Sequence, residues 1–334
     1  TQPDTGPDGI PNELIKIAET LLTPPLTCIF NTCFRQANFP PPWKNSCTAI
    51  IRKAAKDDYT NPNAYQPIAL LNTLGKLFEK IINTRLNHWA YISKSIHPGN
   101  VGGIPGRSIN DAFTTLMSWI NHKWREGKIV AGMFLDIKSA YPSVQKDRLI
   151  HILKQKQFPP YWYYIIESFL SSRKTHVRLN QFISHNFQIP NGLPQGSPLS
   201  VMLYLLYNSS LLLPNPPSLN EDNLSLAHID DITHLVATNT IQQGKTKVEE
   251  VMLRSKGWAS IHGALFDEKK TNIIIFTRKK QPLKEFVIAG ATYTLQKEVR
   301  WLGITLTPTL APTRHIQIMK TKAKTTLNQP SRII

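Results

Sequence analysis

Three aspartates are the residues of this chain that are best suited to chemistry. Asp230 and Asp231 are adjacent, and they separate an apolar stretch that ends near His228 from one that begins at Ile232. Both flanks predict strands, so the two carboxylates are expected at the tip of a β-hairpin. Like charges this close resist joint ionisation, and a divalent cation removes that cost because hard cations bind carboxylate oxygens. Taken alone, the pair also fits a solvated acidic turn.

A third carboxylate shifts this balance towards a metal site. Asp136 ends another predicted strand, over residues 129–135, and lies far from Asp230 in the sequence. Only the fold can bring the two segments together, and a central strand that pairs beside the hairpin would do so. The sequence therefore predicts a cation site where the two segments meet.

The composition predicts a folded, nucleic-acid-binding or membrane-associated protein. The chain has 334 residues, and its 41% apolar content supports a packed core in one large domain or two to three subdomains. The formal net charge of +17 predicts a polyanionic partner or an anionic membrane surface. No apolar run approaches the roughly 18 residues of a membrane span. The longest candidate, 201–213, is interrupted by polar residues and is interpreted as a buried helix. The three cysteines fit no zinc pattern.

The helices and strands that must position these residues are predicted from hydrophobic periodicity and from residues that start or break a helix. Ser108 and Asp111 resemble a capping box, and Ser197 with Pro198 predicts a helix start. A helix near 74–86 has a basic face that fits either solvent or phosphate. Helices are expected from about Pro11 to a break at Pro24–Pro25, then to about 36, and over 74–86, 108–126, 143–157, 161–171, 197–212, 247–262 and the last twenty residues. Strands are expected over 43–52, 129–135, 176–179, 182–189, 224–229, 232–237, 272–276, 286–293 and 300–306, the last with a bend at Gly303.

In this order, the motifs resemble the reverse transcriptase domain of a non-LTR (LINE-type) retrotransposon. The resemblance runs from Gly6 to about Leu306, and its most specific string is 192–200. The other catalytic-type motifs are 136–141, 228–231, 266–276 and 301–303. Segments 6–11, 65–71 and 102–111 resemble the extended fingers of this lineage. A group II intron or retron enzyme shares the core motifs, but the 102–103 loop and the 301–303 segment favour the LINE lineage.

The resemblance implies an α+β fold, the right-hand polymerase fold, with an antiparallel palm sheet, helical fingers and only the start of a thumb. The implied domains are fingers (1–126), palm (127–156), a fingers or palm insertion (157–190), palm (191–306) and a truncated thumb (307–334).

The implied activity is RNA-directed DNA polymerase: two-metal nucleotidyl transfer on a primed RNA template. The expected cofactor is a pair of Mg²⁺ ions, with Mn²⁺ as a substitute. The expected partners are an RNA template, a DNA primer and dNTPs, without a membrane. An intact element is expected to carry an endonuclease, which this chain lacks, as it lacks an RNase H. Nuclear localisation is expected of an active element, although no targeting signal is visible.

The resemblance also assigns roles to residues. Asp136, Asp230 and the Ile137 carbonyl are expected to bind the metals, with Asp231 in support. Lys270 is expected to protonate or neutralise the leaving pyrophosphate, or to be a solvated lysine. The expected dNTP-binding residues are Lys53, Gln66, Ile137, Ala140, Tyr141, Gln195 and Gly196, and the expected primer grip is Trp301, Leu302 and Gly303.

Three of these assignments have a structural alternative. Tyr141 is the candidate steric gate that excludes a ribose hydroxyl, or it is an ordinary core aromatic residue. Gln195 contacts the template or nucleotide edge, or it stabilises its own loop. Trp301 supports the primer backbone, or it is a buried core indole.

Two departures from the family pattern bear on activity. Gln66 stands where an arginine is usual, and glutamine lacks the charge and the fork that clamp a triphosphate. His228 stands where an aromatic residue is usual, which brings a polar, titratable ring. Both suggest weakened catalysis, so a catalytically inactive nucleic-acid-binding relic remains the alternative function.

Overall fold

The computed structural model describes residues 5–54, 58–179, 181–214, 217–279, 284–288 and 290–328. The chain forms two compact units, each built from separate stretches of sequence. Unit 1 comprises 1–96, 139–209 and 262–264, and unit 2 comprises 97–138, 210–261 and 265–334. The last six residues of the expected thumb lie outside the described residues.

Unit 2 is built on a four-stranded antiparallel sheet in the order β7-β8-β3-β9. Its strands are β3 (Ile129–Asp136), β7 (Asn223–His228), β8 (Asp231–Thr238) and β9 (Asn272–Phe276). Every residue of β3 before Asp136 is buried, because this central strand is covered on both faces. The expected antiparallel sheet and its hairpin are thus present.

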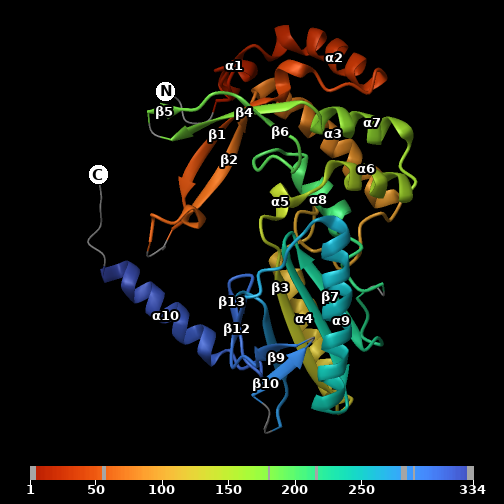
Figure 1. Ribbon diagram of the computed structural model, residues 1–334, viewed down its shortest axis with the longest axis vertical. Coiled ribbons are helices and arrows are strands. Elements are labelled where there is room, and N and C mark those ends of the chain that lie inside the picture. Colours follow the sequence, from red (N-terminus) through yellow and green to blue (C-terminus); the bar gives the residue numbers. More distant parts are fainter. Residues whose placement is uncertain are drawn as a thin grey trace. The chain divides into compact units, whose positions relative to one another are not determined.

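Helices cover both faces of this sheet (Figure 1). On one face lies α4 (Ile109–Arg125), which begins with the predicted capping box between Ser108 and Asp111. Its apolar side chains Leu116, Trp119 and Ile120 share a core with alternate residues of all four strands. The other face is covered by α9 (Ile241–His262): a Cβ built at Gly244 lies 3.5 Å from the Cβ of Ala131.

Three small elements complete unit 2. The hairpin β12 (Val299–Trp301) and β13 (Ile304–Leu306) packs on the core shared with α4. A second hairpin joins β10 (Glu285–Ile288) and β11 (Ala291–Thr294), and α10 (Thr313–Asn328) follows. The predicted single strand over 300–306 is wrong. Leu302 and Gly303 both have positive φ, +46° and +86°, the signature of a two-residue type I′ hairpin turn.

Both outer strands of the sheet have an additional neighbour. At β7, Ala227 receives hydrogen bonds from the backbone N–H of Val101 and Gly102 and donates to the carbonyl of Gly99. At β9, Ile273 forms a parallel bridge with Leu295, and its carbonyl accepts from the Gln296 N–H at 2.8 Å. The 99–102 loop is therefore held along the sheet.

Unit 1 combines a mixed sheet with a set of helices. The strands β1 (Asn45–Arg52), β2 (Tyr65–Leu71), β4 (Arg173–Leu179), β5 (Phe182–Ile183) and β6 (Phe187–Ile189) form one sheet. The pairing of β1 with β4 is parallel, and the other pairings are antiparallel. The helical elements are α1 (Asn12–Ile17), α2 (Glu19–Arg35), η1 (Pro41–Lys44), η2 (Pro62–Ala64), α3 (Thr73–Ile92), α5 (Ala140–Ser143), α6 (Lys146–Gln155), α7 (Pro160–Leu170) and α8 (Ser200–Asn208). A cluster of aromatic rings around Phe78 of α3 anchors this unit.

Two local predictions about unit 1 are wrong. The helix does not break at Pro24–Pro25 but at Ala18, and both prolines lie inside α2. The carbonyls of Thr20 and Leu21, which lose their helical donors, belong to exposed residues and can be hydrated. The helix after Ser197 begins at Ser200, because the Ser197 hydroxyl accepts from the Leu199 N–H and forms a turn instead of an N-cap.

Across the described residues, no helix has both the length and the apolar character that a bilayer crossing requires.

The prolines of α2 provide a test of this fold. Pro25→Ala restores a helical N–H and removes a ring clash, so we expect it to raise the free energy of unfolding by about 1–3 kcal/mol. Urea denaturation followed by circular dichroism measures the change. Pro41→Ala is the matched control, since Pro41 occupies the first position of η1, where an N–H has no helical partner. Equal effects of the two substitutions would contradict the observed course of α2.

Candidate active site

Strand pairing in unit 2 brings the three aspartates together. Asp136 is the last residue of β3, and it lies directly opposite Asp231, the first residue of β8. Opposed residues in an antiparallel pair have Cα atoms about 5 Å apart. Asp231 is also the partner of His228 at the end of β7, so Asp230 occupies the hairpin turn between them. The two segments that the sequence separates therefore meet at one end of the sheet.

The turn that carries Asp230 has an unusual backbone. Ile229, its first residue, has φ +61°, in the left-handed region that a β-branched side chain rarely adopts. Such a conformation costs of order 1–3 kcal/mol and persists only where the surroundings impose it. The paired ends of β7 and β8 impose it here, and the strain accompanies the placement of Asp230.

The carboxylates form an electrostatically unfavourable cluster. Burial, and then the charges of Asp230 and Asp136, raise the pKa of Asp231 to about 6. Burial is also the main reason why the pKa of Asp230 is raised, with the charge of Asp136 adding to it. The excess of negative charge is what a bound cation would relieve.

Lys270 supplies one positive charge to this cluster. Its ammonium lies 2.8 Å from Asp136 Oδ2, and this hydrogen bond raises the pKa of Lys270. The turn that presents Lys270 is fixed by backbone hydrogen bonds: the Asp267 N–H donates to the Asp136 carbonyl, and the Lys270 N–H donates to the Asp267 carbonyl. Lys270 is thus tied to the aspartates by both its side chain and its backbone.

A cavity of about 480 Å³ lies beside these residues, and the expected primer-grip segment lines it. Asp136, Asp231 and Lys270 form part of its wall, together with Trp301, Leu302 and Gly303. Trp301 is only 4% exposed and packs edge-on against Phe134, so its indole is a core residue as well as a cavity wall. Arg300 and Lys269 line the same cavity, and the sequence analysis did not single them out.

The donor set of this cluster suits a hard divalent cation, because carboxylate oxygens are its preferred ligands. Burial first, and the neighbouring carboxylates second, raise the pKa values of Asp230 and Asp231, and a bound cation would offset both effects. Within the described residues, no group of three or more His, Cys, Asp or Glu side chains is already arranged to hold a metal ion. The ammonium of Lys270 provides the countercharge at Asp136 instead.

His228, the departure from the family pattern, lies against the backbone of the 99–102 loop. A Cβ built at Gly102 would lie 2.8 Å from Cγ of the His228 ring, so only glycine fits at this position. The imidazole is therefore in close contact with the loop that runs along β7.

Unit 1 gathers the residues expected to bind the nucleotide. The 191–200 loop is fastened at several points: the Gly192 N–H donates to the Val144 carbonyl, and the Leu193 N–H donates to the Tyr141 carbonyl, both at 2.8 Å. The Gln195 carbonyl accepts from the Ala69 N–H of β2 at 2.7 Å. At Gly196 a Cβ would lie 2.7 Å from the Ala69 carbonyl oxygen, so the close approach that requires glycine is to β2.

Four further nucleotide candidates, Lys53, Gln66, Ala140 and Tyr141, lie in the same unit. Gln66 of β2 pairs with Ile51, and Lys53 follows β1 at the same end of this hairpin. The Lys53 ammonium donates to the Asn63 carbonyl at 3.1 Å. Tyr141 is half-buried, and its ring centroid lies 5.4 Å from that of Tyr204, while Ala140 is buried at the start of α5. Ile137, the expected backbone ligand, belongs to unit 2 and is bridged to Phe266.

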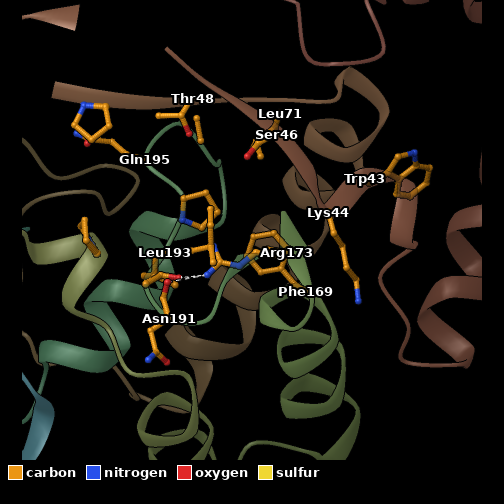
Figure 2. A pocket seen from close by; sticks show the side chains of 16 residues that line it. Trp43, Lys44, Ser46, Thr48, Leu71, Phe169, Arg173, Asn191, Leu193 and Gln195 are labelled. Carbon is orange, nitrogen blue, oxygen red and sulfur yellow. Dashed lines mark hydrogen bonds between the residues drawn. The ribbon is translucent and has the colours of Figure 1, made fainter. Parts of the chain in front are cut away.

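A hollow of about 160 Å³ separates the loop from β1 and β2 (Figure 2). Its walls include Gln195, Leu193, Thr48 and Phe169, and the guanidinium of Arg173 reaches the loop at Asn191 and Gly192. The sequence analysis missed Arg173 and also Glu79, both of which are buried. Glu79 could have been noticed, because it interrupts the apolar face of α3 between Gly75 and Ile82.

Comparison with known proteins decides the family. The family model described as reverse transcriptase (RNA-dependent DNA polymerase) matches residues 51–306. This chain belongs to the reverse transcriptase family. Members of the family generally use divalent metal ions, in agreement with the oxygen donors of the aspartate cluster. The resemblance to LINE-type elements is also confirmed, because the similar proteins are RNA-directed DNA polymerases from mobile elements.

Relatives of this reverse transcriptase domain come from mobile elements. The RNA-directed DNA polymerase from mobile element jockey of Drosophila melanogaster is 26% identical over 331 residues, which is 98% of this chain and 36% of the relative. The probable RNA-directed DNA polymerase from transposon BS of the same organism is 27% identical over 316 residues, or 93% and 35%. The chain thus spans about a third of the length of these relatives.

Solved structures confirm the expected α+β, right-hand polymerase fold. Telomerase from Candida tropicalis in complex with a fragment of telomeric RNA superposes with a TM-score of 0.55 at 13% identity, covering 86% of this chain and 47% of that one. The apo form truncated from its C-terminal domain gives 0.54 at 12% identity, covering 86% and 58%. At this identity the likeness concerns the fold alone.

The strained turn gives a testable consequence. Ile229→Asn should raise the free energy of unfolding by about 1 kcal/mol, because asparagine tolerates positive φ. Urea unfolding monitored by tryptophan fluorescence measures the change. Val287→Asn is the control, since Val287 is also β-branched but lies in the extended strand β10, where asparagine relieves no positive φ. A loss of stability with Ile229→Asn would show that Ile229 is held by side-chain contacts and not strained.

Proposed function

We propose that this chain is the RNA-directed DNA polymerase domain of a non-LTR retrotransposon, which extends a DNA primer on an RNA template. The observation that carries the proposal is the meeting of Asp136, Asp230 and Asp231 at one end of the β7-β8-β3-β9 sheet. Family membership supports it, because the matched family is defined by RNA-dependent DNA synthesis. Palm, fingers and thumb remain proposed names for the segments 127–156 with 191–306, 1–126 and 307–334, with 157–190 as an insertion.

Two Mg²⁺ ions are the proposed cofactor, with Mn²⁺ as a substitute. Asp136, Asp230 and the Ile137 carbonyl would hold them, with Asp231 in support. When bound, such a pair stabilises the attacking 3′-oxygen of a primer and the oxygen that leaves with pyrophosphate.

The chain's own side chains have distinct proposed tasks. Lys270 neutralises charge on the leaving pyrophosphate, and its raised pKa favours this role over release of a proton. Tyr141 acts as the steric gate that selects deoxynucleotides. Lys53 and Gln66 contact the triphosphate, Gln195 and Gly196 form the surface that meets the nascent base pair, and Ala140 lies beside the gate.

The cavity next to the carboxylates is the proposed site of the primer end. Leu302 and Gly303 form the turn of the β12–β13 hairpin on its wall, with Gly303 exposed and Leu302 packed against the core, and the buried Trp301 supports that turn. Arg300 and Lys269 bring positive charge to the same wall, which suits a phosphate backbone. The net charge of +17 favours the RNA template and DNA primer as partners.

The decisive experiment is primer extension on an RNA template with Mg²⁺ or Mn²⁺. We expect the chain to incorporate dNTPs and Asp230→Asn to lower incorporation by more than about 100-fold, since a charged ligand is lost. Asp222→Asn is the matched control, because Asp222 is an exposed carboxylate that pairs with Lys128. Binding of primer-template without incorporation in any of these proteins would support the inactive relic.

A second prediction concerns the missing arginine. Gln66→Arg adds a charge-assisted contact to the triphosphate, so the KM for dNTP should fall by roughly tenfold or more. Steady-state primer extension measures it. Gln188→Arg on the exposed strand β6 controls for added positive charge elsewhere in unit 1. An unchanged KM, or an equal fall in both variants, would show that position 66 does not contact the triphosphate.

A further inference from the structure

Unit 1 buries two opposite charges that none of the proposed chemical steps uses. Glu79 on α3 is 0% exposed, and Arg173, the first residue of β4, is 5% exposed. The charge of each favours the ionised form of the other. Burial of charge is costly unless hydrogen bonds and a countercharge compensate it. The partners of these two groups therefore indicate what the burial achieves.

Glu79 holds the loop just after Gln195 and Gly196. The Ser197 hydroxyl donates to Glu79 Oε2, and the same hydroxyl accepts from the Leu199 N–H at 3.1 Å. The Leu199 N–H also interacts with the Glu79 carboxylate. Because Ser197 is two residues beyond Gln195, the carboxylate fixes the turn through which the Gln195–Gly196 pair is presented.

Arg173 holds the other end of the same loop. Its Nη2 donates to the carbonyls of Asn191, at 3.1 Å, and Gly192, and its Nε donates to the Leu170 carbonyl at 3.3 Å. Figure 2 shows this guanidinium extended towards the loop. The two buried charges thus fasten the start and the end of the 191–197 segment to α3 and β4.

The network is not arranged for maximal stability. Glu79 Oε1 is buried and has no hydrogen-bond partner within the described part of the chain. An unsatisfied buried oxygen lowers stability, and an apolar residue on this face of α3 would avoid the cost. This suggests that the carboxylate is retained for what it does to the loop.

We propose that Glu79 is a positioning residue that, through Ser197, sets the conformation in which Gln195 and Gly196 meet the nucleotide and template. This inference rests on the proposed function of the loop. Glu79 itself touches no substrate and acts only through the loop.

The charge state of Glu79 provides a signature of this role. Burial raises its pKa to about 7, opposed by the Ser197 and Leu199 hydrogen bonds and by the charges of Lys76 on α3 and Arg173 on β4. The ionised carboxylate is the better acceptor, so the loop is held more firmly above pH 7 than below it. Because the folded pKa is raised, folding stability falls as the pH rises from about 4.5 to 7, in the opposite direction to loop positioning.

Steady-state primer extension with Glu79→Ala, Glu79→Gln and Ser197→Ala tests the proposal. We expect Glu79→Ala and Ser197→Ala to raise the KM for dNTP by roughly tenfold with a smaller change in kcat, as for a lost buried hydrogen bond. The ratio of the KM of Glu79→Gln to that of the wild type should rise severalfold between pH 6 and pH 8, because only the wild type gains a charge.

Thr175→Val controls for the loss of a buried hydroxyl in the same unit, since Thr175 donates to the Ser46 carbonyl and not to the loop. Unchanged KM values in folded Glu79→Ala and Ser197→Ala would overturn the proposal.

Deuterium exchange of peptides over 191–200 tests the loop independently of activity. Exchange should accelerate in Glu79→Ala and Ser197→Ala and stay unchanged in Thr175→Val. If Glu79→Ala does not fold, Ser197→Ala carries the measurement. Unchanged exchange in folded variants overturns the inference even if the enzyme is active. Faster exchange in a chain that never extends a primer upholds the positioning role and overturns the polymerase proposal.

Discussion

The register between β3 and β8 is the constraint on which the rest of the molecule depends. It sets Asp136 opposite Asp231, on the sheet face that also packs against α4 and the β12–β13 hairpin. Side chains alternate along a strand, so a slip by one residue would turn Asp136 away from Asp231 and move apolar groups out of the core. The apolar interior of β3 therefore secures the position of charges that repel one another.

Much of unit 2 could be predicted because its signals are local. An unbroken apolar run marks the buried strand β3, alternation marks the hairpin, and Ser108 with Asp111 marks the start of α4. Asp136 at the end of β3 and Asp231 at the start of β8 sufficed to predict where the charges meet. The type I′ turn was missed because leucine is unusual at a position with positive φ, so Leu302 gave no turn signal. Gly303 by itself fits a bend within one strand as well as it fits a turn between two strands.

Unit 1 was harder to predict because its key contacts join distant segments. The parallel pairing of β1 with β4 depends on register across more than a hundred residues. The hydrogen bonds of Ser197 to Glu79 and of Arg173 to Gly192 join α3, the 191–200 loop and β4, and only Glu79, within the apolar face of α3, has a local signal. Pro24 and Pro25 led to a wrong prediction because proline disfavours a helix interior. In α2 the carbonyls that lose their hydrogen-bond donors belong to residues that face solvent, which a propensity alone does not reveal. The palm, fingers and thumb boundaries stay a prediction, and the two compact units divide the chain at other points.

The 99–102 loop has a consequence beyond its contact with His228. Outer strands of a sheet expose unpaired backbone groups that can recruit another chain into a growing sheet, and natural proteins shield them. Here the loop occupies the outer side of β7 at Ala227, and the bridge to Leu295 occupies that of β9 at Ile273. Both flanks are thus partly blocked against intermolecular strand addition. The backbone of both outer strands of the unit 2 sheet is thereby shielded in part by short segments that form no regular strand.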